Sequence, residues 1–283
     1  MPRVVAVLLI TVACGNSSSD GGGPVAVVAS FYPLAEVARQ VGGDHVRVTD
    51  LTPPGAEPHD LELTSDQVDA LEDAEVLLYL GGGFQPAVEA VVERSRGQAV
   101  DLLSELPADD DPHVWLDPTQ MARVVDLTET ALREADPAGA DVFAANANGY
   151  RDRVAALDAE YRAGLAQCQR RVLVTAHDAF AHLARRYGLT VESISGLSPE
   201  AEPDPRRIAE LSDLVRRQGA TTVFTETLVP PDVADTLARE AGVRTAILDP
   251  IEGLSEEQVS GGESYISVMQ QNLATLREAL GCT

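Results

Sequence analysis

Short apolar or β-branched runs alternate along the chain with amphipathic stretches, several of which open with proline and close near glycine. The runs that predict strands are Val25–Ser30, Val46–Leu51, Val76–Leu80, Val100–Leu102, Val172–Ala176, Thr190–Ile194, Thr222–Thr225 and Thr245–Leu248. The amphipathic stretches that predict helices include Leu34–Val41, Pro86–Arg94, Pro205–Arg217 and Pro231–Glu240. Strands that alternate with helices indicate an α/β fold with mainly parallel sheets flanked by helices.

One segment, from Ala138 to Cys168, interrupts this alternation because it has no strand signal. It is rich in alanine, and its apolar positions recur at helical spacing, for example at Tyr150, Val154 and Leu157. A helix of about 30 residues would be about 45 Å long, too long for one crossover in a small lobe. We therefore predict two α/β lobes, at 24–137 and 169–283, joined by one long backbone helix at 138–168.

The first residues, "MPRVVAVLLITVACGNSSSDGGGP", indicate export. The apolar run from Val4 to Val12 is too short to span a bilayer, which is typical of a bacterial signal sequence. We predict a signal peptide at 1–13, lipid modification at Cys14 and a flexible tether at 14–23. A cleaved signal with an incidental cysteine, or a start codon placed too far downstream, are the alternatives. The expected location is the outer face of the cytoplasmic membrane.

Composition excludes several classes of function. The 283 residues carry a formal net charge of −24, which argues against binding nucleic acid, because affinity for phosphates comes from Lys and Arg. The same charge repels anionic lipid, so we expect membrane contact only through the lipid anchor. The sequence has no lysine, and this excludes a P-loop and a Schiff-base enzyme.

Two cysteines remain once Cys14 is assigned to lipid. Cys168 and Cys282 form an even pair in an oxidising compartment, which favours one disulfide between the C-terminus and the second half of the chain. Two buried free thiols are the alternative.

The stretch "DPHVWLDP" places His113 and the single tryptophan between two Asp-Pro pairs. Proline fixes φ and restricts the residue before it, so this loop would hold the His113 imidazole in a fixed direction, as a metal ligand requires. A simpler interpretation is that Asp117 only caps a helix that starts at Pro118. Trp115 either covers the cleft and excludes water, or is an ordinary core aromatic.

Four side chains that can bind a metal follow predicted strands: His59, His113, His177 and Asp249. The carboxyl ends of parallel strands converge on one crevice, so each lobe would supply two of the four. Three imidazoles and one carboxylate make a closed four-coordinate set that suits Zn²⁺. His45 and His182 fit structural roles.

Five motifs, in this order and spacing, resemble the ZnuA-like zinc-binding lipoproteins of metal-importing ABC transporters. They are "EPHDLELTSDQV", "DPHVWLDP", "TAHDAFAHLARRYGL", "GLSPEAEPDPRRIAEL" and "LDPIEG". The resemblance implies two lobes joined by a long helix, with the metal in the cleft between them. It implies that His59, His113, His177 and Asp249 bind the ion and that Glu226 lies just outside this set.

The resemblance also implies a receptor, not an enzyme, that delivers Zn²⁺ to a permease, and we expect a monomer. Manganese-binding relatives carry a glutamate in place of His177, which favours zinc here. Many zinc members have a long His/Asp-rich loop before the second histidine motif, whereas this chain has only "ADDDP". We interpret Asp109–Asp111 as a solvated turn.

Two alternatives remain open. In a zinc-dependent hydrolase, three histidines would leave an open coordination position, Asp249 would act as the base and Glu226 as a second acid. No HExxH or G-x-S-x-G motif supports this. A manganese-binding receptor of the same fold is the second alternative.

Overall fold

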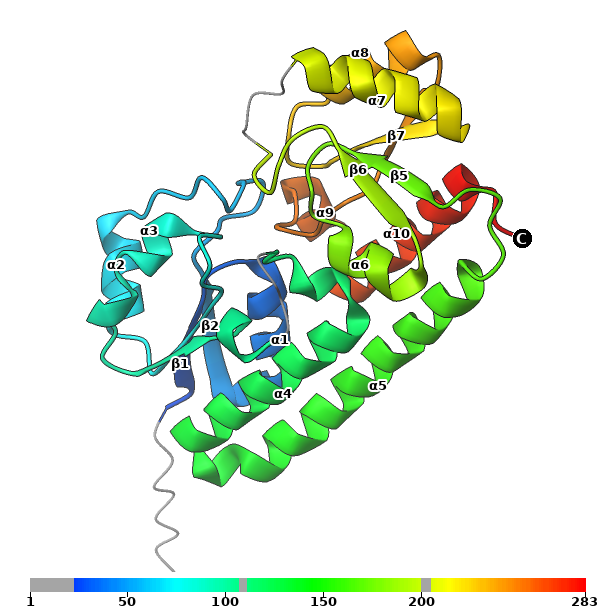
Figure 1. Cartoon of the computed structure of the whole chain (residues 1–283). Helices are drawn as coiled ribbons and strands as arrows, with labels where there is room; N and C mark the ends of the chain where they lie inside the picture. The colour runs from blue at the N-terminus through cyan, green and yellow to red at the C-terminus, as the bar shows by residue number, and fades with distance from the viewer. Residues whose placement is uncertain (1–22, 107–110, 200–204) are drawn as a thin grey trace, which may run out of the picture.

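The computed structural model describes residues 23–106, 111–199 and 205–283, so the predicted signal peptide and Cys14 lie outside the described residues. Helices and strands alternate along the chain (Figure 1). The strands are β1 Val25–Ala29, β2 Val46–Asp50, β3 Val76–Tyr79, β4 Gln98–Asp101, β5 Val172–Thr175, β6 Thr190–Ser193, β7 Thr222–Thr225 and β8 Arg244–Ile247. The α-helices are α1 Tyr32–Gly42, α2 Ser65–Glu72, α3 Pro86–Glu89, α4 Pro118–Ala135, α5 Ala140–Gly164, α6 Ala181–Tyr187, α7 Pro205–Gln218, α8 Asp232–Ala241, α9 Glu256–Ser260 and α10 Tyr265–Leu280. The 3₁₀ turns are η1 Gly43–His45, η2 Val92–Arg94, η3 Leu103–Glu105, η4 Val114–Leu116 and η5 Pro137–Gly139.

The first lobe is built on a parallel sheet in the order β2-β1-β3-β4. The apolar residues of β1 and β3, such as Val27 and Leu77, are buried. The helix expected at Pro86–Arg94 is interrupted. It ends at Glu89 and resumes as the η2 turn, because Val91 leaves the helical conformation.

The second lobe contains two parallel strand pairs, β5-β6 and β7-β8. Strand β5 lies beside β7, and α7 and α8 pack against this pair of strands. Every ladder between named strands in the described residues is parallel, so the predicted α/β class with mainly parallel sheets is confirmed. The carboxyl ends of β5 and β7 lie next to each other, because His177 after β5 bonds to Glu226 after β7.

Helix α5 connects the lobes. Its buried residues, among them Tyr150, Val154 and Leu157, follow the helical spacing read from the sequence. At 25 residues it is about 37 Å long and contacts α1 and α4 of the first lobe and α10 of the second. Figure 1 shows it running beneath both lobes. The predicted long helix is confirmed, although the boundaries expected at 137/138 and 168/169 stay predictions.

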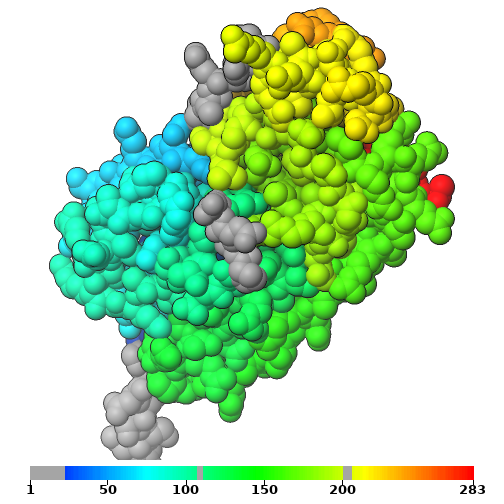
Figure 2. Space-filling model, viewed as in Figure 1, coloured from blue at the N-terminus to red at the C-terminus, as the bar shows by residue number. Residues whose placement is uncertain are grey.

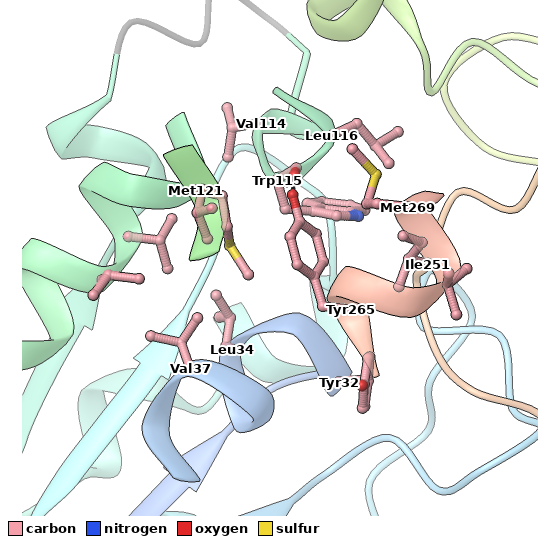
Figure 3. Packing of buried hydrophobic residues seen from close by; sticks show 14 of the residues in the cluster. Tyr32, Leu34, Val37, Val114, Trp115, Leu116, Met121, Ile251, Tyr265 and Met269 are labelled. Atoms are coloured by element: carbon pink, nitrogen blue, oxygen red, sulfur yellow. Dashed lines mark hydrogen bonds between the residues drawn. The ribbon is translucent and has the colours of Figure 1, made fainter. Parts of the chain in front are cut away.

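The two lobes share a continuous apolar core. Figure 2 shows them in contact along one face of the molecule. In Figure 3, Trp115 from the first lobe lies among Ile251, Tyr265 and Met269 from the second. The Trp115 indole donates a hydrogen bond to the Pro250 carbonyl at 2.7 Å, and the Tyr265 hydroxyl donates to the Trp115 carbonyl at 2.6 Å. Packing and hydrogen bonds thus hold the lobes together here.

The end of the chain is fixed to the end of α5. Cys168 and Cys282 form the predicted disulfide. Backbone hydrogen bonds between 167–170 and 280–283 accompany it. None of the helices in the described part of the chain has the length and apolar character needed to cross a membrane.

Candidate metal centre

Four side chains from both lobes converge between them. His59, His113, His177 and Glu252 each bring one potential ligand atom to within 4.8 Å of the others. His113 and His177 are fully buried, and Glu252 is 2% exposed. A concentration of three imidazoles around one carboxylate at the meeting point of two lobes is a candidate metal centre.

The spacing of these atoms matches the coordination shell of zinc. The Glu252 Oε1 lies 3.3 Å from the His59 Nε2 and 3.1 Å from the Nε2 atoms of His113 and His177. The two latter nitrogens are 3.4 Å apart. Tetrahedral zinc with bonds of 2.0–2.1 Å places its ligands roughly 3.3 Å from one another. Four of the six distances among the ligand atoms therefore lie close to the spacing in a tetrahedral zinc shell.

The His113 turn is held by the carboxylate two residues before it. The Asp111 Oδ1 accepts hydrogen bonds from both the backbone N–H of His113, at 3.0 Å, and its ring Nδ1, at 2.7 Å. Asp117 also caps α4, because its side chain accepts from the backbone N–H of Thr119. The two interpretations of "DPHVWLDP" are therefore compatible: the segment starts a helix and aims His113 at the cluster.

His177 is held in the same way from a neighbouring strand. It follows β5, and Glu226 follows β7, which lies beside β5. The Glu226 Oε1 accepts from the His177 backbone N–H at 3.1 Å and from its Nδ1 at 2.7 Å. A carboxylate on Nδ1 fixes the proton there and leaves Nε2 directed at the centre, which is the tautomer that binds metal.

The buried charges compensate one another. Burial alone would lower the pKa of His177, but hydrogen bonds to Glu226 and Glu252 outweigh it and raise this pKa to about 10. The pKa of His113 is raised by Asp111 and Glu252 against the same effect of burial. Burial would raise the pKa of Glu252, but the three histidines hold it well below its usual value. The metal-free site therefore pairs an ionised Glu252 with protonated imidazole.

His59 has a different environment. It lies in the loop after β2, its ring contacts Phe84, and its backbone N–H donates to Glu57 at 2.9 Å. Within the described residues, no carboxylate is bonded to its Nδ1. Burial and the charge of Glu252 raise the pKa of Glu57 to about 9, so Glu57 is neutral at pH 7. His59 is thus the least firmly held of the three imidazoles.

Comparison with known proteins agrees with this geometry. Residues 27–279 match the family model ZnuA, described as "Zinc-uptake complex component A periplasmic". The chain belongs to the ZnuA family. It is 34% identical to the zinc-binding lipoprotein AdcA of Streptococcus pneumoniae over 95% of this chain, but spans only 58% of that relative. It is 32% identical to the high-affinity zinc uptake system protein ZnuA of Bacillus subtilis, over 98% of this chain and 96% of that protein. The crystal structure of the Zn(II)-bound ZnuA-like domain of S. pneumoniae AdcA superposes with a TM-score of 0.80, at 34% identity, and covers 91% of this chain and 99% of that one.

One predicted ligand of this ZnuA-family chain is not in the cluster. The Asp249 carboxylate is occupied by the backbone N–H of Ile251 and by the side chains of Thr227 and Gln258. Glu252, three residues further on, supplies the carboxylate of the cluster. The sequence prediction placed the metal-binding acid at Asp249, just after β8. In the structure the chain continues for three more residues before an acid, Glu252, reaches the cluster.

The remaining predicted residues have clear places. Trp115 is 1% exposed and its ring is 5.2 Å from that of His113, so it is both a core aromatic and a wall of the site. His45 bonds to Asp136 outside the cluster. His182 is buried and contacts the Asp111 carbonyl, as a structural histidine would.

Two functional residues were missed. The interpretation of Asp111 as a solvated residue is wrong, because its carboxylate lies inside the site against His113, while Asp109 and Asp110 lie outside the described residues. Its position two residues before a histidine, with proline between, was the available signal. Glu252 could have been noticed as the second acid of "LDPIEG".

Proposed function

We propose that this chain is an extracytoplasmic receptor that captures Zn²⁺ and delivers it to an ABC permease. The observation that carries this proposal is the convergence of His59, His113, His177 and Glu252 from both lobes within 4.8 Å. Zinc is cargo here, so the site needs to bind and release it, without performing chemistry on it. Bridging both lobes would let the ion stabilise the closed arrangement.

The donor set favours zinc over manganese. Three nitrogens and one oxygen suit Zn²⁺, while manganese, magnesium and calcium prefer more oxygen ligands. The glutamate expected at the position of His177 in a manganese receptor is absent from this chain. The manganese alternative is therefore not favoured.

The hydrolase alternative is also not favoured. A catalytic zinc keeps an open position for water, whereas Glu252 completes a four-coordinate set here. Asp249, the candidate base, is buried beside Gln258 and Thr227 and does not face the centre. Glu226 is bonded to the far side of His177, away from the Nε2 atoms.

We further propose that the chain is exported and anchored through lipid at Cys14, and that it works as a monomer. The signal-like first residues and the lipoprotein names of relatives such as AdcA support the anchor. The partner is the permease of a zinc uptake system, which the family description supports. Labelled palmitate incorporated by wild-type chain but not by Cys14→Ser would support the anchor, and equal labelling would refute it.

Calorimetric titration with Zn²⁺ and Mn²⁺ tests the proposed function. We expect one tight zinc site, much weaker manganese binding and loss of the zinc site in His113→Ala. His45→Ala is the matched control, because His45 bonds to Asp136 away from the cluster. Zinc binding that survives in His113→Ala, or manganese binding as tight as zinc binding, would refute the proposal.

Delivery is tested in cells. Zinc accumulation by a bacterium that expresses the cognate permease should rise with the wild-type receptor and His45→Ala, and stay at the background level with His113→Ala. Equal accumulation with His113→Ala would show that capture at this site is not part of uptake.

A further inference from the structure

The turn that leads into Glu252 has an unusual backbone. Ile251 has φ of 57°, in the left-handed region, and no other non-glycine residue among those described has a positive φ. A β-branched residue is disfavoured there because of steric contacts of its side chain. Its side chain is nevertheless fully buried in the core shared by the lobes. Something must hold this residue in place.

The Asp249 carboxylate provides the direct restraint. Its Oδ1 accepts a hydrogen bond of 2.7 Å from the backbone N–H of Ile251. Its Oδ2 accepts from the Thr227 hydroxyl at 2.7 Å and from the Gln258 amide at 2.9 Å. Asp249 is 5% exposed, so these three bonds replace the water that the carboxylate loses on burial.

The backbone on either side of Ile251 is also fixed. The Asn272 amide bonds to both the N–H and the carbonyl of Asp249, at 2.9 and 2.6 Å. The Trp115 indole bonds to the Pro250 carbonyl. With Asp249 and Pro250 held in this way, the conformation of Ile251 sets the direction in which the chain continues to Glu252.

We propose that Asp249 is a positioning residue of the zinc site. By accepting the Ile251 N–H, it holds the turn 249–252 in the left-handed conformation that carries the Glu252 carboxylate to the three histidines. This inference rests on the proposed function, because it assigns a role in forming the same site. Asp249 thereby differs from a metal ligand, which would contact the ion, and from a residue needed only for folding.

Two substitutions distinguish a positioning role from a ligand role. Asp249→Asn keeps a carbonyl oxygen that can accept the Ile251 N–H, while its amide nitrogen replaces Oδ2, so the bond from Gln258 is lost and the Thr227 hydroxyl has to turn to accept. Asp249→Glu keeps a carboxylate that could bind a metal, but its longer chain moves the acceptor away from the N–H. A positioning role therefore predicts that Asn is tolerated better than Glu, and a ligand role predicts the reverse.

The experiment measures zinc affinity of the full chain by competition with a chromophoric chelator, together with the visible spectrum of the Co²⁺-loaded protein. We expect Asp249→Glu and Asp249→Ala to weaken zinc binding by about 10–100-fold, the usual effect of losing an outer partner of a ligand. Their cobalt spectra should change, because Glu252 no longer holds its place. Asp249→Asn keeps the bond to the Ile251 N–H and loses the one from Gln258, so its affinity should fall less than that of Asp249→Glu and its spectrum should change less.

Controls separate this inference from folding and from the proposed function. Thr227→Val removes one bond to Oδ2 and leaves the Ile251 N–H bonded, so its cobalt spectrum should be unchanged. Glu252→Gln gives the effect of a lost ligand.

If Asp249→Glu binds zinc as well as or better than Asp249→Asn, or if Asp249→Ala leaves affinity and spectrum unchanged, the positioning role is overturned while the proposed function stands. Zinc binding unaffected by His113→Ala would overturn both.

Discussion

The turn that carries His113 and the loop that carries His59 belong to the same lobe but are held differently. The His113 ring is fully buried, its Nδ1 bonds to Asp111, and its neighbour Trp115 fills the core between the lobes. The His59 ring is bonded only to Glu252, and exposed residues at 53–55 precede it. His177, supported by Glu226, resembles His113 in this respect.

This difference indicates how the site is assembled. Two imidazoles are fixed before the ion arrives, each by a carboxylate that orients both its backbone and its ring. The third imidazole comes from a more exposed loop. We infer that His113, His177 and Glu252 form the preorganised part of the site and that His59 is its least firmly held ligand.

The largest expected effect concerns the rigid side of this comparison. Trp115→Ala should lower the free energy of unfolding by about 3–5 kcal/mol, because it leaves a cavity in the shared core and removes the bond to Pro250. Asp60→Ala, next to His59 on the exposed loop, should change it by no more than about 0.5 kcal/mol. Urea unfolding of the metal-free variants measures both. Similar losses of unfolding free energy in Trp115→Ala and Asp60→Ala would contradict the difference in rigidity between the two regions.

The next effect concerns the carboxylates behind the histidines. Asp111→Ala and Glu226→Ala should each weaken zinc binding by about 10–100-fold, since they release the ring that each carboxylate orients. Glu57→Ala should weaken it by less than about tenfold, because the hydrogen bond between Glu57 and His59 involves the backbone N–H and leaves the ring free. Chelator competition gives the three affinities. A Glu57 variant as weak as the other two would show that His59 is equally preorganised.

The last of these effects is the change of zinc affinity with pH, which we expect to originate on the rigid side. The pKa of His177 is raised to about 10 by Glu226 and Glu252, against the effect of burial. Zinc must displace this proton at neutral pH, so apparent affinity should fall as pH falls, by about tenfold per pH unit for each displaced proton. Calorimetry in buffers of different ionisation enthalpy counts the protons released.

The raised pKa of His177 also predicts how the stability of the metal-free protein depends on pH. Because the folded pKa lies above the usual value of about 6.5, the charged histidine stabilises the metal-free fold below that pH. This contribution is lost as pH rises from about 6.5 toward 10. Thermal melts should show the loss in metal-free wild type and a smaller loss in Glu226→Gln. Equal pH dependence in the two proteins would contradict the assignment to His177.

Much of this architecture could be predicted from the sequence. Strands were recognisable from short β-branched runs, and α5 from apolar residues at helical spacing across a stretch with no strand signal. The three histidines share one context, a segment between a strand and the following α-helix, and this is a local property of the chain. Long elements and repeated local contexts are therefore readable without tertiary information.

The carboxylate of the site was not predictable in the same way. Asp249 lies two residues after the end of β8, as His177 lies two residues after the end of β5, so it occupies the expected ligand position. The left-handed conformation of Ile251 redirects the chain, and it depends on contacts from distant residues such as Trp115 and Asn272. Contacts between residues so far apart in the chain cannot be predicted from the spacing of residues in the sequence. For Asp111, the spacing to His113 was a signal in the sequence, but the hydrogen bonds between the two residues became evident only from the fold.

The most direct test of the account is a crystal structure of the zinc-loaded protein, with anomalous data collected on both sides of the zinc absorption edge. We predict one zinc ion bound by the Nε2 atoms of His59, His113 and His177 and by the carboxylate of Glu252, with Asp249 still bonded to the Ile251 N–H. A zinc ion bound by Asp249, or one that keeps a water molecule in place of Glu252, would contradict it.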